Sequence, residues 1–195
     1  EYWGLWSLVL PRLASVMQHT TYLLSDRIVV FSPSMLEYPP LQSFEEKIYQ
    51  LKFNFESVPD NLDPVTKRDE IVVYLGRIAR LKGADSVAAA VEQLSEGGQP
   101  PFDEVLFIGD GHLDEQLERR LNGNSATSDL VTFTGWLDRE EAMESLEQAT
   151  VYVLPSESEG LPKALQEAMA RGVIPVVSPV GDIPNVVSDG HNGIV

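Results

Sequence analysis

The sequence of 195 residues has no cysteine and far fewer basic than acidic residues. The absence of cysteine excludes a disulfide framework and any metal site built on thiolates. With 14 Lys and Arg against 30 Asp and Glu, the formal net charge is −16. Because nucleic-acid binding needs clustered cations, this charge argues against a nucleic-acid partner and against broad adhesion to anionic lipid. An anion-binding site in this chain must therefore be a local concentration of Arg or Lys.

Long hydrophobic runs are also missing, and no segment has the length of a membrane span. The apolar stretch at residues 3–10 is interrupted by Pro11 and has no basic leader, so it is not typical of a signal peptide. A cytoplasmic protein is the simplest expectation. The pattern Gly-x-x-x-x-Gly-Lys-Ser/Thr does not occur either, which removes the common phosphate loop of NTPases.

From about residue 70 onward, short apolar runs alternate with amphipathic stretches. Strands that are apolar throughout are typical of a parallel sheet covered on both faces. Their alternation with helices predicts an α/β fold with a doubly wound, Rossmann-like parallel sheet. Asp138, followed by Glu141, predicts an N-cap with a capping box. The expected strands are 71–75, 105–108, 131–134, 151–154 and 174–177, and the expected helices are 84–94, 113–121, 140–146 and 163–170.

The first 60 residues do not fit this sheet. A long helical stretch precedes an expected strand at 26–32, and Ser43 followed by Glu46 predicts a second capping box that opens a short helix. We therefore expect residues 1–51 to be the C-terminal remnant of a preceding domain. Residues 52–195 are expected to form the main domain, truncated at its C-terminus, where a Gly-Ile-Val strand start has no closing helix after it.

The turns that follow the strands are the places where Rossmann-like sheets bind ligands. The first turn reads Gly76-Arg77-Ile-Ala-Arg-Leu-Lys82-Gly83. Glycine lets the backbone approach a ligand closely, and a following helix N-terminus favours phosphate. Arg77 and Lys82 leave the same strand end and could clamp a diphosphate. Salt bridges between two surface cations and an acidic protein are the alternative.

The second and third turns have two readings each. Gly109-Asp-Gly111-His112 suits a ligand, but a tight strand-to-helix turn explains its glycines equally well. Gly135-Trp136-Leu137-Asp138 offers backbone polar groups beside a bulky apolar side chain. That combination would suit a planar base, and an ordinary helix cap is the alternative.

The fourth turn, with the helix after it, is the most informative. Pro162 suits the first helical position, and Gly172 suits the position just past the helix end. Glu159 stands in the loop before Pro162, and Glu167 lies off the apolar stripe a little over one turn into the helix. From these positions both carboxylates can face a cleft at different depths. A carboxylate accepts two hydroxyl hydrogen bonds at once, so one could hold a ribose and the other a sugar. Negative charge near a helix N-terminus also stabilises the helix, and this would explain either Glu alone.

Together these turns resemble glycosyltransferase family 4 (group 1), retaining enzymes of GT-B fold, over about residues 60–195. The matching motifs are Gly-Arg-(x)4-Lys-Gly at 76–83, Phe-Ile-Gly-Asp-Gly-His at 107–112, Val-Thr-Phe-Thr-Gly-Trp-Leu at 131–137, Glu-(x)7-Glu within 159–172, and Val-Gly-Asp-Ile-Pro…Gly-His-Asn-Gly at 180–193. The resemblance implies the C-terminal, nucleotide-sugar-binding domain of a GT-B enzyme with a remnant of its N-terminal domain. It also implies transfer of a hexosyl group, with the anomeric configuration retained.

The resemblance implies a role for each site residue as well. Arg77 and Lys82 would neutralise the departing nucleoside diphosphate, and Glu159 would face the transferred sugar. Glu167 would bind the ribose hydroxyls, and the backbone around Leu137 would meet the base. The remaining donor-binding residues would be Gly76, Gly109, Gly111, Gly160 and Leu161.

The expected partners are a nucleotide-sugar donor and a glycan, lipid or small-molecule acceptor, as in polysaccharide or glycolipid biosynthesis. No Asp-x-Asp pair occurs, so we expect no metal and no cofactor beyond the donor as co-substrate. The acceptor would contact mainly the N-terminal domain, which leaves peripheral association with the inner membrane face open. Without that domain, the chain is expected to be inactive. Two alternatives remain: a nucleotide-sugar epimerase of GT-B fold, and a non-catalytic nucleotide-binding module whose acid pair is structural.

Overall fold

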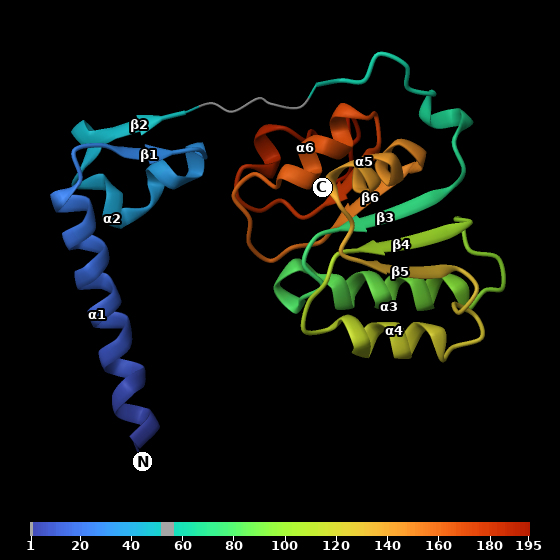
Figure 1. Ribbon diagram of the computed structural model, residues 1–195, viewed down its shortest axis with the longest axis horizontal. Coiled ribbons are helices and arrows are strands. Elements are labelled where there is room, and N and C mark those ends of the chain that lie inside the picture. Colours follow the sequence, from blue (N-terminus) through green and yellow to red (C-terminus); the bar gives the residue numbers. More distant parts are fainter. Residues whose placement is uncertain (1, 52–56) are drawn as a thin grey trace. The chain divides into compact units, whose positions relative to one another are not determined.

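A computed structural model of the chain describes residues 2–51 and 57–195 (Figure 1). The chain separates into two compact units, Glu1–Asn54 and Phe55–Val195. The domain boundary expected after residue 51 adjoins residues 52–56, which lie outside the described part. No helix within the described residues is both long enough and apolar enough to cross a membrane.

The first unit is a long helix beside a small two-stranded parallel sheet. Its sheet pairs Ile28 with Ile48. The C-terminus of the long helix is capped by Lys47, whose Nζ donates to the carbonyl oxygens of Leu23 at 2.7 Å and Ser25 at 2.9 Å. The elements are α1 (Tyr2–Leu24), β1 (Ile28–Val30), a 3-10 turn (Pro33–Glu37), α2 (Pro39–Gln42), a second 3-10 turn (Glu45–Lys47) and β2 (Ile48–Gln50).

The long helical stretch expected before residue 26 is present as α1, and Pro11 lies inside it. One sequence expectation for this unit is wrong. Ser43 does not open a helix with a capping box. It lies at the C-cap of α2, and the following 3-10 turn has Phe44 at its N-cap with no side-chain hydrogen bond. The expected strand at 26–32 is present but shorter, as β1.

The second unit is a five-stranded parallel sheet in the order β5-β4-β3-β6-β7. Figure 1 shows α3 and α4 on one face of the sheet and α5 and α6 on the other, so the sheet is doubly wound as predicted. All five strands and four helices expected from the sequence are confirmed, with bounds that differ by no more than two residues. They are β3 (Ile71–Leu75), α3 (Ala84–Ser95), β4 (Glu104–Ile108), α4 (Asp114–Asn122), β5 (Val131–Gly135), α5 (Arg139–Gln148), β6 (Val151–Leu154), α6 (Lys163–Ala170) and β7 (Ile174–Val177); 3-10 turns are Val65–Lys67, Arg80–Lys82 and Ile183–Asn185.

The helix ends agree with the sequence in part. The capping box at α5 is complete: Asp138 Oδ1 accepts from the Glu141 amide, and Glu141 Oε2 accepts from the Asp138 amide, both at 3.0 Å. Pro162 occupies the N-cap of α6 and not its first helical position, since its ψ of 131° is extended. Gly172 follows the helix with a φ of 70°, as expected for a C-terminal glycine.

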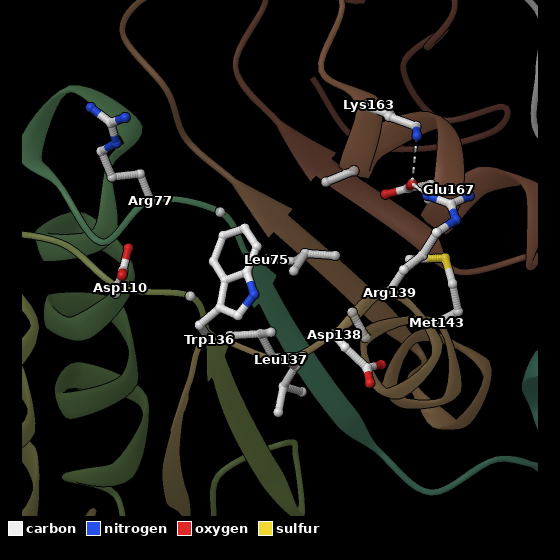
Figure 2. Close-up of a pocket in the computed structure, with 15 residues that line it drawn as sticks. Leu75, Arg77, Asp110, Trp136, Leu137, Asp138, Arg139, Met143, Lys163 and Glu167 are labelled. Carbon is white, nitrogen blue, oxygen red and sulfur yellow. Dashed lines mark hydrogen bonds and ion pairs between the residues drawn. The ribbon is translucent and has the colours of Figure 1, made fainter.

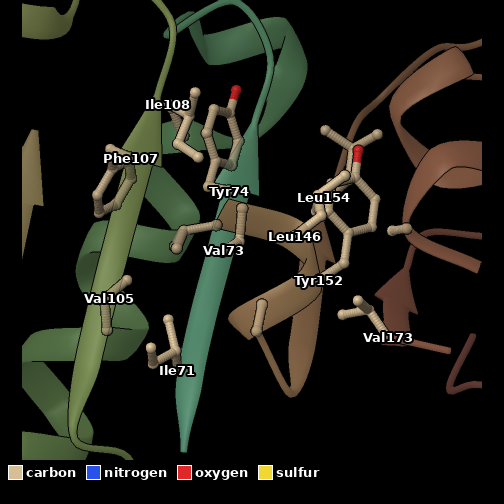
Figure 3. Close-up of a cluster of buried hydrophobic side chains, with 14 of the residues drawn as sticks. Ile71, Val73, Tyr74, Val105, Phe107, Ile108, Leu146, Tyr152, Leu154 and Val173 are labelled. Atoms are coloured by element: carbon tan, nitrogen blue, oxygen red, sulfur yellow. The ribbon is translucent and has the colours of Figure 1, made fainter. Parts of the chain in front are cut away.

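The core of this unit extends to the carboxyl ends of β3, β4 and β6, where Tyr74, Ile108 and Leu154 are buried (Figure 3). Tyr74 on β3 and Tyr152 on β6 are fully buried, and the Phe107 ring stacks on that of Phe133 with centroids 4.6 Å apart. The Tyr74 hydroxyl donates to the carbonyl oxygen of Arg77 at 2.6 Å. A buried side chain therefore fixes the backbone of the turn after β3.

Candidate functional site

The carboxyl ends of β3, β4 and β5 open into a cleft of about 510 Å³, which α5 and α6 close on the other side. This is the edge at which open α/β sheets bind ligands, and the volume suits a small-molecule site. The lining residues are Leu75, Gly76, Arg77, Ile108, Gly109, Asp110, Trp136, Leu137, Asp138, Arg139, Ala142, Met143, Lys163, Ala164 and Glu167.

Glu167 is the buried acid of the cleft (Figure 2). Its side chain is only 8% exposed, and its Oε1 lies 2.5 Å from Nη1 of Arg139 and 3.6 Å from Nζ of Lys163. Arg139 and Lys163 are the first residues of α5 and α6. A buried carboxylate needs cationic or hydrogen-bonding partners to stay charged, and here both cations also line the cleft.

Arg77 is the cation of the cleft that lies away from the buried acid, and it is exposed. Figure 2 shows its guanidinium extending from the turn after β3, on the side of the cleft away from Glu167. Within the part of the chain that the structure describes, the guanidinium has no hydrogen bond or salt bridge. The salt-bridge explanation of this residue is therefore not supported, and a ligand would meet an unshielded positive charge.

Lys82 and Glu159 meet where β3 and β6 end, two strands that are neighbours in the sheet. Nζ of Lys82 lies 2.7 Å from Oε1 of Glu159, whose side chain is 7% exposed. The same oxygen accepts from the hydroxyl of Ser156, also at 2.7 Å. Neither charged residue is among those that line the cleft. For Lys82 the structure thus shows the salt bridge that the sequence left open as an alternative, with an acid of the predicted site as its partner.

The glycines of the second turn serve close packing between neighbouring loops. A Cβ on Gly109 would stand 2.2 Å from the carbonyl oxygen of Gly76, and one on Gly111 would stand 2.2 Å from that of Ile78. These distances are far below van der Waals contact, so only glycine fits. The tight-turn explanation is sufficient for both residues, although Gly109 also lines the cleft.

Half of the predicted site lies in this one cleft. Gly76, Arg77, Gly109, Leu137 and Glu167 line it, whereas Lys82, Gly111, Glu159, Gly160 and Leu161 do not. The cleft also contains residues that sequence reasoning missed, chiefly Arg139 and Lys163. The spacing of four residues between Lys163 and Glu167 is a helical ion-pair signal that could have found Lys163. Arg139 has no such signal because only the packing of α5 on α6 brings it to Glu167.

Comparisons with known proteins identify the family of the chain. The family model described as "Glycosyl transferases group 1" matches residues 69–195, and the chain therefore belongs to this family. In sequence it is similar to the sulfoquinovosyl transferase SQD2 of Arabidopsis thaliana, with 32% identity over 123 residues, which are 63% of this chain and 22% of that protein.

Two solved structures share the fold. One is a mutant of S. aureus TarM in complex with Fondaparinux, alpha-GlcNAc-glycerol and UDP, with a TM-score of 0.69 at 17% identity. The match covers 87% of this chain and 33% of the TarM chain. The other is the pneumococcal O-GlcNAc transferase GtfA in complex with UDP and GlcNAc, with a TM-score of 0.69 at 23% identity. That match covers 92% of this chain and 35% of the GtfA chain. The second unit is thus the Rossmann-like domain of a GT-B fold. The chain spans between about a fifth and a third of the curated relatives it matches.

Proposed function

We propose that this chain binds the donor in a retaining, metal-independent glycosyltransferase, which moves a hexosyl group from a nucleoside-diphosphate sugar to a glycan, lipid or small-molecule acceptor. The observation that carries the proposal is that one cleft has a positive charge on one side and a negative charge on the other. Arg77 offers an unpartnered guanidinium, and Glu167 offers a carboxylate held between two cations. A nucleoside diphosphate has the complementary groups, a diphosphate and a ribose with two hydroxyls.

The residues act by binding and by charge compensation. Arg77 would face the diphosphate, where a guanidinium forms charge-assisted hydrogen bonds with phosphate oxygens. Glu167 would accept hydrogen bonds from ribose hydroxyls. Negative charge accumulates on the diphosphate as the glycosidic bond breaks, and a fixed cation there stabilises the transition state more than the ground state. The sugar would then lie toward Glu159 and Lys82, where β3 and β6 end.

The comparisons support the donor class without naming this chain's donor. TarM and GtfA were both solved with UDP, and both are similar to this chain in fold. The family match supports a transferase, and the comparisons give the epimerase alternative no support. Retention is proposed from the motif resemblance alone. The anomeric configuration of the product, read by NMR on the full-length protein, tests it.

Calorimetric titration of UDP, GDP and ADP onto the chain tests the donor site. We expect at least one of them to bind, with the same affinity in the presence of EDTA. Arg77→Ala should lower the affinity for the nucleoside diphosphate about 10-fold or more. It should leave the affinity for the corresponding nucleoside unchanged. Glu167→Gln should lower the affinity for the nucleoside diphosphate and for the nucleoside, because both ligands contain the ribose.

Arg80 provides the matched control for Arg77. It lies three residues further along the same turn, its side chain is 72% exposed, and it does not line the cleft. Arg80→Ala should therefore bind as the wild type does. No binding of any of the three diphosphates would refute the donor site. Binding without release of nucleoside diphosphate from nucleotide sugar by the full-length protein would favour the non-catalytic binding module.

A further inference from the structure

Arg139 lines the cleft and makes a direct contact with its buried acid. Its Nη1 donates to the Oε1 of Glu167 at 2.5 Å, a hydrogen bond in which both groups are charged. Figure 2 shows the guanidinium of Arg139 beside the Glu167 carboxylate. The orientation of this carboxylate decides whether its oxygens can accept from a ligand, so the residue that sets the orientation matters for binding.

The two cations on Glu167 are not equivalent. The Nζ of Lys163 lies 3.6 Å from Oε1, beyond the range of about 2.7 to 3.2 Å of a well-formed hydrogen bond. Lys163 also precedes the acid by four residues on the same helix, and this order of charges is the weaker one for a helical ion pair. Arg139 comes from another helix and donates directly. Arg139 therefore sets the direction of the carboxylate, and Lys163 mainly adds charge.

The position of Arg139 is unfavourable for the helix that carries it. Arg139 is the first residue of α5, directly after the N-cap Asp138. The helix macrodipole disfavours a cation in the first turn. The side chain is also 56% exposed, so burial contributes little to its stability. A residue that breaks a local rule inside a cleft indicates a task in that cleft.

The packing of α5 beside α6 does not depend on Arg139 alone. At the other end of the two helices, Arg68 donates from Nη1 to the carbonyl oxygen of Ala149 at 3.0 Å and from Nη2 to that of Arg171 at 2.7 Å. Ala149 and Arg171 are the C-caps of α5 and α6. Leu146 of α5 is fully buried in the core. Loss of the Arg139 side chain should therefore leave both helices in place and release only the carboxylate.

We propose that Arg139 is a positioning residue for ribose recognition, which holds the Glu167 carboxylate so that its remaining lone pairs face the cleft. This inference rests on the proposed function, which places the ribose at Glu167. A carboxylate has about four acceptor sites, so a hydrogen bond from Arg139 leaves others for the two ribose hydroxyls. Arg139 acts through the acid and does not itself contact the ribose. Without it, the carboxylate turns freely and the hydroxyls lose a fixed acceptor.

The preference for ribose over dideoxyribose measures this role. UDP, GDP and ADP and their 2′,3′-dideoxy counterparts are titrated by calorimetry onto the wild type and onto Arg139→Ala. We expect the wild type to bind the ribose form of its ligand about 10-fold more tightly or better, as for a hydrogen bond to a charged group. In Arg139→Ala this ratio should fall to about 3 or less, because only the affinity for the ribose form decreases.

Two further variants separate orientation from charge. Lys163→Ala removes the other cation of the same acid, and we expect its ratio to stay well above that of Arg139→Ala. Arg80→Ala, outside the cleft lining, should keep the wild-type ratio. Both ligands are titrated onto the same variant, so a smaller folded fraction affects both titrations alike and leaves the ratio unchanged.

Several results would overturn the inference, and they differ in what they leave standing. A wild-type ratio in Arg139→Ala refutes the positioning role and leaves the donor site intact. An equal loss of affinity for both ligands would show that Arg139 compensates the charge of the diphosphate. Tighter binding of the ribose form by Arg139→Ala would show that Arg139 competes with the ribose. If Lys163→Ala lowers the ratio as far as Arg139→Ala does, charge and not orientation sets the preference.

The wild type separates this inference from the proposed function. If it binds a nucleoside diphosphate without preferring ribose, the assignment of ribose to Glu167 fails, and the positioning role fails with it. If it binds none of the three nucleotides, the donor site itself is refuted.

Discussion

Arg139 reaches from the first turn of α5 to Glu167 on α6, where its Nη1 lies 2.5 Å from the Oε1 of the acid. The side chain of Arg139 is 56% exposed, whereas that of Glu167 is 8% exposed. The pair thus joins two helices at the wall of the cleft and compensates a buried negative charge. It also places a cation beside the carboxylate to which we assign the ribose.

A double-mutant cycle on Arg139→Ala and Glu167→Gln should show this coupling. We expect an interaction free energy of about 1 kcal/mol in urea unfolding, because one partner is buried and the other is partly screened by water. The pair of Arg80 with Asp85, whose side chains are 72% and 30% exposed and lie 3.7 Å apart, is the control, and we expect its interaction free energy to be close to zero. A coupling of zero for Arg139 and Glu167 would contradict the assigned ion pair.

Lys82→Met should destabilise the domain by about 1–3 kcal/mol. The change leaves the carboxylate of Glu159, 7% exposed, without its cation at 2.7 Å. Lys67→Met, which changes an exposed lysine in the same domain, is the control and should have little effect. Chemical denaturation of the two variants measures the difference. If both variants unfold at the wild-type midpoint, the contact between Lys82 and Glu159 is not a stabilising one.

Gly111→Ala should destabilise the domain by more than about 2 kcal/mol. The new Cβ would stand 2.2 Å from the carbonyl oxygen of Ile78, and two packed loops would have to move apart. Gly97→Ala is the matched control, because nothing lies within 4 Å of a Cβ there. Thermal unfolding compares the two. A small effect at Gly111, equal to that at Gly97, would show that this glycine is not required by loop packing.

Alkaline pH should lower the stability of the domain through its buried tyrosines. Burial raises the pKa of Tyr74 and of Tyr152, and the negative charge of Glu159 adds to both shifts. Because the folded pKa lies above the unfolded value of about 10, the stabilising contribution is complete below pH 10 and is lost as the pH rises toward the folded pKa. The loss can reach about 1.4 kcal/mol per pH unit for each tyrosine.

Urea unfolding between pH 8 and pH 11 measures this effect. Tyr152→Phe should make the decline above pH 10 shallower, since the ionisable group is removed. Tyr49→Phe, which changes a ring that is 60% exposed in the first unit, should keep the wild-type pH dependence. Identical curves for Tyr152→Phe and the wild type would exclude the buried hydroxyl as the cause.

The local patterns of the second unit were strong enough to predict its elements. Short apolar runs and helical stripes are set by neighbouring residues, and a parallel sheet buried on both faces leaves few alternatives for them. The capping box at Asp138 was predicted for the same reason, since its two hydrogen bonds join residues three positions apart. The similar pattern at Ser43 failed because that residue falls at the end of α2 and not at the start of a helix.

The site could be predicted only in outline. The turns after the strands were expected to hold it, and Arg77 and Glu167 do line one cleft. The sequence did not reveal that Lys82 would be paired with Glu159 outside that lining, because the two residues are 77 positions apart. Contacts of this kind depend on which strands are neighbours, and local spacing does not encode the strand order.

The sequence by itself therefore determined the elements, the fold class and the edge of the sheet where the cleft lies, since these follow from periodicity and from the turn residues. Only the tertiary structure decided which side chains share the cleft. Arg139 joins Glu167 because α5 packs beside α6, and Trp136 faces the cleft because its turn is held by Gly109 on one side and by the start of α5 on the other. Packing between distant segments sets these relationships, and no pattern within either segment contains them.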